Sequence, residues 1–149
     1  MAHVTLGGCQ CGAIRYALSG ALPPAYACHC SACKKQSASA FSMSIVVGLE
    51  GLAILGTPAS FGSMAFSGAR KTCYFCPKCG TRLWHASSAS AGVVTLKVGS
   101  LDDSVDISPS AHLWVSKKQA GINLDPNIPA FDSQPENLAD WREGLRWPR

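Results

Sequence analysis

The sequence predicts a single, mainly β domain of 149 residues. Three observations lead to this prediction. Short segments rich in β-branched and aromatic residues alternate with turns of glycine, serine and proline, as in chains built of many short strands. Hydrophobic residues make up 47% of the chain, which is enough for an apolar core. The 8 cysteines fall into three close-spaced clusters, a pattern typical of metal sites.

The expected strands are short and follow one another along most of the chain. They lie near Val4–Leu6, Ile14–Leu18, Ala25–Cys28, Ser42–Val47, Ala53–Leu55, Ser60–Phe66, Thr72–Phe75, Arg82–Ala86, Val93–Val98 and His112–Val115. A short helical turn is expected over Ser31–Ser37, after the second cluster. Leu124–Gln134 is expected to be irregular because it contains prolines. Pro135–Trp147 is expected to form one turn or helix, since Trp141 and Leu145 are one helical turn apart.

The whole chain, 1–149, is expected to form one domain with its core at about 4–131 and a C-terminal wrap or short helix over 132–149. A net charge of +4 without a stripe of Lys and Arg argues against a nucleic-acid partner. No apolar run approaches the roughly 20 residues of a membrane helix. The N-terminus also lacks the basic and apolar regions of a secretory signal. We therefore expect a cytoplasmic protein without a membrane partner, and the sequence leaves its oligomeric state open.

In a reducing compartment, close-spaced cysteines are metal ligands more often than structural disulfides. The first and third clusters each place two thiols on a tight turn that ends in glycine: Cys9-Gln10-Cys11-Gly12 and Cys76-Pro77-Lys78-Cys79-Gly80. Glycine adopts the positive φ that such a turn needs after its second ligand. Two of these turns supply four thiolates, and closed sites of four cysteines are structural. We assign one structural zinc to Cys9, Cys11, Cys76 and Cys79.

Cys76 and Cys79 also have the spacing of a thioredoxin-like redox pair. That motif requires a helix directly after the first thiol. Gly80 and the strand-like segment Thr81–Trp84 follow instead. We therefore favour the metal-ligand interpretation of this motif.

The second cluster, Cys28-His29-Cys30-Ser31-Ala32-Cys33-Lys34-Lys35, has three thiols and no closing glycine. Three thiolates leave one tetrahedral position open for water or substrate, as in a catalytic zinc site. We predict a catalytic zinc on Cys28, Cys30 and Cys33. A fourth protein ligand would make this site structural instead. Cys73 is the stronger candidate for that ligand, and His29 is the weaker because it lies between two ligands.

Together these motifs resemble the glutathione-dependent formaldehyde-activating enzyme family. The similar segments are, in chain order, Gly7–Tyr16, Cys28–Lys35, Phe75–Thr81, Val98–Asp103 and His112–Val115. The resemblance implies two packed antiparallel sheets with short helical turns. It also implies a structural zinc and a catalytic zinc on the two sets of cysteines named above. The activity that it implies is that of a carbon–sulfur lyase of the S-(hydroxymethyl)glutathione synthase type, which adds glutathione to formaldehyde reversibly.

The expected substrates are a small-molecule thiol such as glutathione and a small carbonyl compound. Because glutathione carries two carboxylates, cationic side chains should line its site. We name His29, Lys34 and Lys35 as candidate substrate-binding residues, with Arg70, Lys71 and Arg82 as more distant candidates. Ser37, where the family often has glycine, and the lack of a tryptophan near Gln119–Gly121 leave the substrate open.

Two functions of other classes compete with the enzyme. A non-catalytic, zinc-stabilised binding module for a protein partner would have a closed second site and a large exposed apolar patch. A zinc or thiol buffer would have a labile second zinc without a shaped pocket beside it. The fourth ligand of the second cluster discriminates the enzyme from the binding module.

Overall fold

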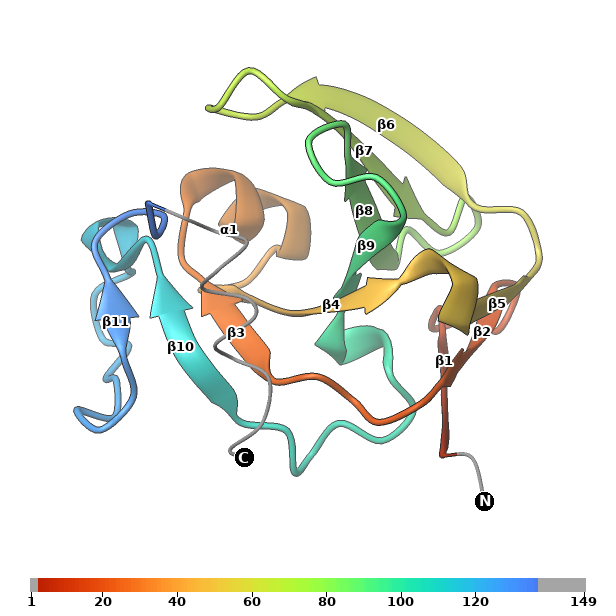
Figure 1. Cartoon of the computed structure of the whole chain (residues 1–149), viewed down its shortest axis with the longest axis horizontal. Helices are drawn as coiled ribbons and strands as arrows, with labels where there is room; N and C mark the ends of the chain where they lie inside the picture. The colour runs from red at the N-terminus through yellow and green to blue at the C-terminus, as the bar shows by residue number, and fades with distance from the viewer. Residues whose placement is uncertain (1–2, 137–149) are drawn as a thin grey trace. The chain divides into compact units, whose positions relative to one another are not determined.

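The structure, a computed structural model, describes residues 3–136 of the chain (Figure 1). In these residues the chain is mainly β, with strands in two sheets and one short α-helix, and the predicted fold class is confirmed. The strands are β1 (Val4–Gly8), β2 (Arg15–Ser19), β3 (Ala25–Cys28), β4 (Ser42–Gly48), β5 (Leu52–Leu55), β6 (Ala59–Met64), β7 (Arg70–Phe75), β8 (Arg82–Ser87), β9 (Val93–Lys97), β10 (Pro109–Leu113) and β11 (Ala130–Phe131). The helix α1 spans Ser31–Ser37, and 3-10 turns cover Leu49–Gly51, Val98–Ser100 and Val115–Lys117.

The chain divides into two compact units. The first unit comprises the residues up to Leu22 together with Val46–Asp106, and the second comprises Pro23–Ile45 together with the residues from Ile107 on. The organisation of 1–149 as one domain stays a prediction. The helix expected over Pro135–Trp147 lies almost wholly outside the described residues. None of the helices in the described part of the chain combines the length and the apolar character needed to cross a membrane.

The first unit contains two groups of antiparallel strands that pack on each other. One group has the order β1-β2-β5, and the other has the order β9-β8-β7-β6. Tyr16 of β2 meets Trp84 of β8 edge to face, with ring centroids 6.5 Å apart. Trp84 also stacks on Tyr74, its cross-strand partner in β7, at 5.4 Å. These aromatic contacts join the two groups of strands around one apolar core.

Gly7 of β1 shows how closely the strands approach in this unit. A Cβ at this position would lie 2.3 Å from the Tyr16 hydroxyl oxygen and 2.6 Å from the carbonyl oxygen of Ser100. The Tyr16 hydroxyl in turn lies 2.7 Å from Ser100 Oγ, which donates to the Lys97 carbonyl at 2.7 Å. Glycine is therefore required by the close approach of the neighbouring hydroxyl and backbone oxygens.

The second unit contains β11, β10, β3 and the first part of β4, in that order, together with α1 (Figure 1). β3 and β4 are antiparallel, as expected, whereas β10 runs parallel to both β3 and β11, so the expectation of antiparallel sheets does not hold for this strand. β10 ends at Leu113, two residues before the predicted end of this strand, because Trp114 has a positive φ of 59°. β11 lies inside Leu124–Gln134, which was expected to be irregular, and it pairs over two residues, His112 with Ala130 and Leu113 with Phe131.

Candidate metal sites

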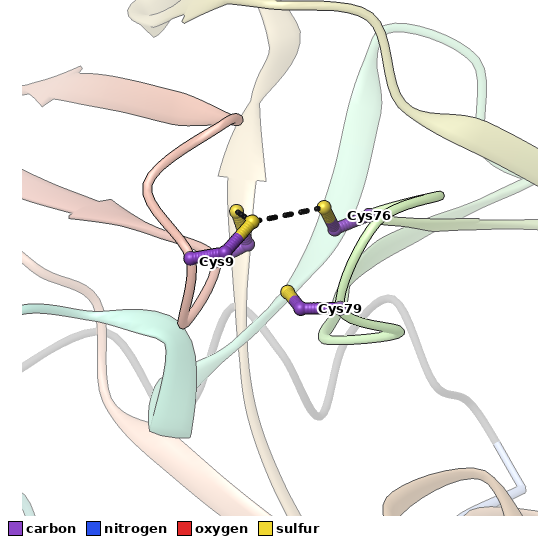
Figure 2. A group of neighbouring side chains, drawn as sticks. Cys9, Cys76 and Cys79 are labelled. Atoms are coloured by element: carbon purple, nitrogen blue, oxygen red, sulfur yellow. Dashed lines mark hydrogen bonds between the residues drawn. The ribbon is translucent and has the colours of Figure 1, made fainter.

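The thiols of Cys9, Cys11, Cys76 and Cys79 come together in the first unit. Figure 2 shows the side chains of Cys9, Cys76 and Cys79 pointing toward one another. Cys9 and Cys11 lie between β1 and β2, and Cys76 and Cys79 lie between β7 and β8. Their sulfurs all lie within 4.8 Å of one another, with Cys9 and Cys11 at 3.6 Å and Cys11 and Cys76 at 3.7 Å. Tetrahedral zinc with Zn–S bonds of about 2.3 Å requires S–S distances of about 3.8 Å. The four thiols therefore fit zinc, and we call them the four-thiol group.

Both turns of the four-thiol group have the glycine geometry that the sequence predicts. Gly12 and Gly80 have φ values of 78° and 77°. The Gly12 N–H donates to the Cys9 carbonyl at 3.1 Å, and the Gly80 N–H donates to the Cys76 carbonyl at 2.8 Å. The Ile14 N–H donates to Cys9 Sγ at 3.2 Å, as expected for a turn that directs backbone N–H groups at a sulfur. The turns hold the sulfurs in place through the backbone.

Thr81, which was not among the residues predicted for this site, links the two turns of the four-thiol group. Its hydroxyl accepts from the Gln10 N–H at 3.1 Å and lies 3.2 Å from Cys79 Sγ. Hydrogen bonds with the Thr81 hydroxyl, the largest cause, and with the backbone N–H groups of Thr81 and Cys11 together lower the pKa of the Cys79 thiol to about 5. For Cys11, an N–H from Ala13 favours the thiolate, but burial and the neighbouring thiols outweigh it and raise the pKa to about 11. A hydroxyl residue two positions after the last ligand is the sequence signal for this contact.

The thiols of Cys28, Cys30 and Cys33 come together in the second unit, also within 4.8 Å of one another. Cys28 ends β3, Cys30 is the N-cap of α1, and Cys33 lies in the first turn of that helix. The Cys33 N–H donates to Cys30 Sγ at 3.3 Å. Hydrogen bonds with Cys30 and Cys33 raise the pKa of the Cys28 thiol, because they favour its protonated form. We call these residues the three-thiol group.

In the described part of the chain, no fourth Cys, His, Asp or Glu joins the three-thiol group. Cys73, the stronger candidate for a fourth ligand, is buried in β7 of the first unit and belongs to neither group. His29 does not join the group either, although it lies between two of its members. The donor set fits zinc with three protein ligands and one position left for water or substrate.

His29, Lys34 and Lys35, the candidate substrate-binding residues, have three different surroundings. The His29 imidazole is fully buried. Its burial is the main cause of its lowered pKa, and the nearby His112 lowers the pKa further. Lys34 is half-buried and its Nζ donates to the Lys117 carbonyl at 2.7 Å, whereas Lys35 is exposed. The substrate-binding role of all three residues stays a prediction.

The fold and the two groups of thiols define a mainly β protein whose cysteines could hold two zinc ions. Residues 4–117 match the family described as glutathione-dependent formaldehyde-activating enzyme, and the chain belongs to this family. The predicted resemblance is confirmed. No curated protein matches the chain. A Rhodobacter sphaeroides protein with a crystal structure from structural genomics is 17% identical, with a TM-score of 0.53, over 85% of this chain and 98% of that one. At this identity, the likeness shows the fold alone.

Proposed function

We propose that the protein is a zinc-dependent carbon–sulfur lyase that adds glutathione to formaldehyde reversibly, of the S-(hydroxymethyl)glutathione synthase type. The observation that carries the proposal is the contrast between four thiols in one group and three in the other. Four thiolates close a structural zinc site, whereas three leave a position for a reacting molecule. The family of the chain supports glutathione and formaldehyde as the substrates.

In this reaction the glutathione sulfur bonds to the carbonyl carbon, the C=O π electrons move to oxygen, and the thiol proton ends on that oxygen. Zinc at the three-thiol group would supply a thiolate nucleophile near neutral pH by lowering the pKa of the incoming thiol. Cys28, Cys30 and Cys33 would hold the ion. The Cys33 N–H stabilises the thiolate form of Cys30 from the backbone at 3.3 Å.

The cations that follow the three-thiol group support an anionic substrate. Lys34 is fixed by the Lys117 carbonyl, and Lys35 is exposed on the helix directly after Cys33. The carboxylates of glutathione would bind a positive charge at this place. We infer that Lys35 contributes to binding more than Lys34, because the Lys34 ammonium already donates to a backbone carbonyl.

Metal content and rate together test the proposed function. Purified wild type should carry two zinc ions per chain and should exchange formaldehyde between glutathione and its adduct faster than the uncatalysed reaction, as measured by NMR magnetisation transfer. Cys33→Ser should lose one zinc and the acceleration. Cys73→Ser, a matched cysteine outside both groups, should keep both. An exchange rate equal to the uncatalysed one would contradict formaldehyde as the substrate, and loss of zinc from Cys73→Ser would contradict the three-ligand site.

The alternative function, a binding module for a protein partner, requires a closed second site. The described residues supply three ligands rather than four, which favours the enzyme. A zinc or thiol buffer would exchange the second zinc readily without accelerating the reaction, so the same experiment separates it from the enzyme. The cytoplasmic location and the absence of nucleic-acid and membrane partners stay predictions.

A further inference from the structure

A buried pair of imidazoles adjoins the three-thiol group in the chain. His29 Nε2 and His112 Nδ1 lie 3.0 Å apart, and the two residues are 0% and 5% exposed. His29 separates two of the three ligands, Cys28 and Cys30, and His112 belongs to β10. Neither imidazole is a member of the three-thiol group, so the pair needs another explanation.

The contacts of His29 attach the middle of this ligand segment to β10. The His29 N–H donates to the Leu113 carbonyl at 2.9 Å, next to the hydrogen bond that its side chain makes with His112. On another side the Phe41 ring lies 5.1 Å from the imidazole, centroid to centroid. β10 is itself held between β3 and β11, so this anchor is part of a sheet. His29 is thus fixed by backbone, imidazole and aromatic contacts.

The contacts that fix His29 also affect the direction in which the thiols of Cys28 and Cys30 point. In extended chain, successive side chains point to opposite sides. Cys28 is the last residue of β3, and Cys30 is extended, with φ −63° and ψ 157°. With the His29 imidazole held toward His112, the side chains on either side of it are turned the other way. The hydrogen bond between the two imidazoles therefore helps to place the sulfurs of Cys28 and Cys30.

The proton of the hydrogen bond between His29 and His112 is expected on one of the two ring nitrogens rather than the other. In the described structure, His29 Nδ1 is buried without a hydrogen-bond partner. A buried N–H without a partner is rarer in proteins than a buried acceptor without one. The proton is therefore expected on His29 Nε2, which donates to His112 Nδ1. Residue 112 then has to supply an acceptor at the Nδ1 position, and the amide oxygen of an asparagine can occupy nearly the same place.

We propose that His112 is a positioning residue for the second metal site. Through its hydrogen bond with His29 it holds the Cys28–Cys30 segment in the conformation that binds the ion, and it thereby sets the affinity of the three-thiol group for metal. The proposal rests on the proposed function only in that the three-thiol group binds metal, and it does not depend on which substrate reacts there.

Cobalt binding to the full chain tests the proposal, because thiolate-bound Co²⁺ has visible absorption bands that report ligand geometry. Wild type, His112→Leu, His112→Asn and His112→Gln are titrated with Co²⁺ against a chelator. Leucine removes the acceptor, asparagine keeps it near the Nδ1 position, and glutamine moves it one carbon further out. Loss of a direct outer partner of a metal ligand weakens metal binding by about 10- to 100-fold, and a contact that acts through His29 should lie at the lower end of that range. We expect this loss, together with a changed spectrum, at the three-thiol group of the leucine and glutamine variants. The asparagine variant should bind cobalt as wild type does.

The four-thiol group serves as the internal control for folding, since it lies in the other unit. Wild-type affinity and spectrum in His112→Leu would overturn the proposal. If His112→Leu does not fold, the comparison of His112→Asn with His112→Gln decides, and equal affinities for these two would overturn it as well. Failure of wild type to bind cobalt at the three-thiol group would contradict the proposed function, whereas normal binding with no acceleration of the reaction would contradict only the substrate assignment.

Discussion

The two groups of thiols are built in different ways. The four-thiol group joins turns that are far apart in the sequence, with Cys11 and Cys76 separated by 65 positions. The three-thiol group lies within one short segment, Cys28–Cys33, at the junction of a strand and a helix. A metal that cross-links distant segments restricts the unfolded chain more than one that closes a short loop. From this difference we propose that the first group stabilises the fold and that the second is available for chemistry.

The largest expected effect is the loss of the long cross-link. Cys76→Ser should lower the free energy of unfolding of the zinc-loaded protein by roughly 4 kcal/mol, if the metal acts like a disulfide that closes a loop of about 65 residues. Cys33→Ser, the matched change in the three-thiol group, should cost clearly less because its loop is short. Urea unfolding followed by circular dichroism measures both values. Equal losses would contradict the assignment of different roles to the two groups.

A smaller effect is expected at Gly7, which precedes the first turn of the four-thiol group. Gly7→Ala should lower the free energy of unfolding by about 1–3 kcal/mol, because the added methyl would overlap the Tyr16 hydroxyl and the Ser100 carbonyl. Gly62→Ala in β6 is the matched control, since no other atom lies within 4 Å of its added Cβ. Thermal unfolding of both variants checks this, and an unchanged midpoint for Gly7→Ala would show that β1 does not approach these groups so closely.

The smallest expected effect concerns the pH dependence of the four-thiol group. Several hydrogen bonds, the largest from the Thr81 hydroxyl, lower the pKa of Cys79 to about 5, so in the metal-free protein this thiol is charged above about pH 5. Its folded pKa lies below the unfolded value of about 8.5, so its stabilising contribution is present above about pH 8.5 and is lost as the pH falls through about 5. Thr81→Val should raise this pKa.

Thiolate absorbance of the metal-free protein as a function of pH measures the change. Thr72→Val in β7 serves as the control threonine, since it lies outside the turn that holds Cys79. An unchanged titration curve in Thr81→Val would show that the threonine hydroxyl does not stabilise this thiolate.

Two elements were predicted with the observed bounds, because two prolines precede the first and the second cysteine cluster marks the junction between them. β3 was predicted with the observed bounds, Ala25–Cys28, and α1 with the observed bounds, Ser31–Ser37. β11 was missed because a two-residue strand has no periodicity of its own and forms by pairing with β10. The predicted end of β10 was wrong because the sequence did not indicate the positive φ of Trp114.

Of the candidate sites, the members of both thiol groups were predicted from cysteine spacing and the placement of glycines. The contacts that surround the thiols could not be predicted in the same way. Thr81 meets Gln10 across 71 positions, and His29 meets His112 across 83. These contacts depend on which strands become neighbours, and local patterns do not determine that. The buried state of His29 is likewise a result of tertiary packing.

The most direct test of the central claim is the order in which zinc leaves the protein. Wild type loaded with two zinc ions is titrated with a chelator at neutral pH while released zinc and circular dichroism are recorded together. We expect two steps, with the first ion leaving the three-thiol group while the fold is retained and the second leaving with loss of structure. Cys33→Ser should lack the first step. Release of both ions in one step together with unfolding, or a single zinc per chain, would contradict the account.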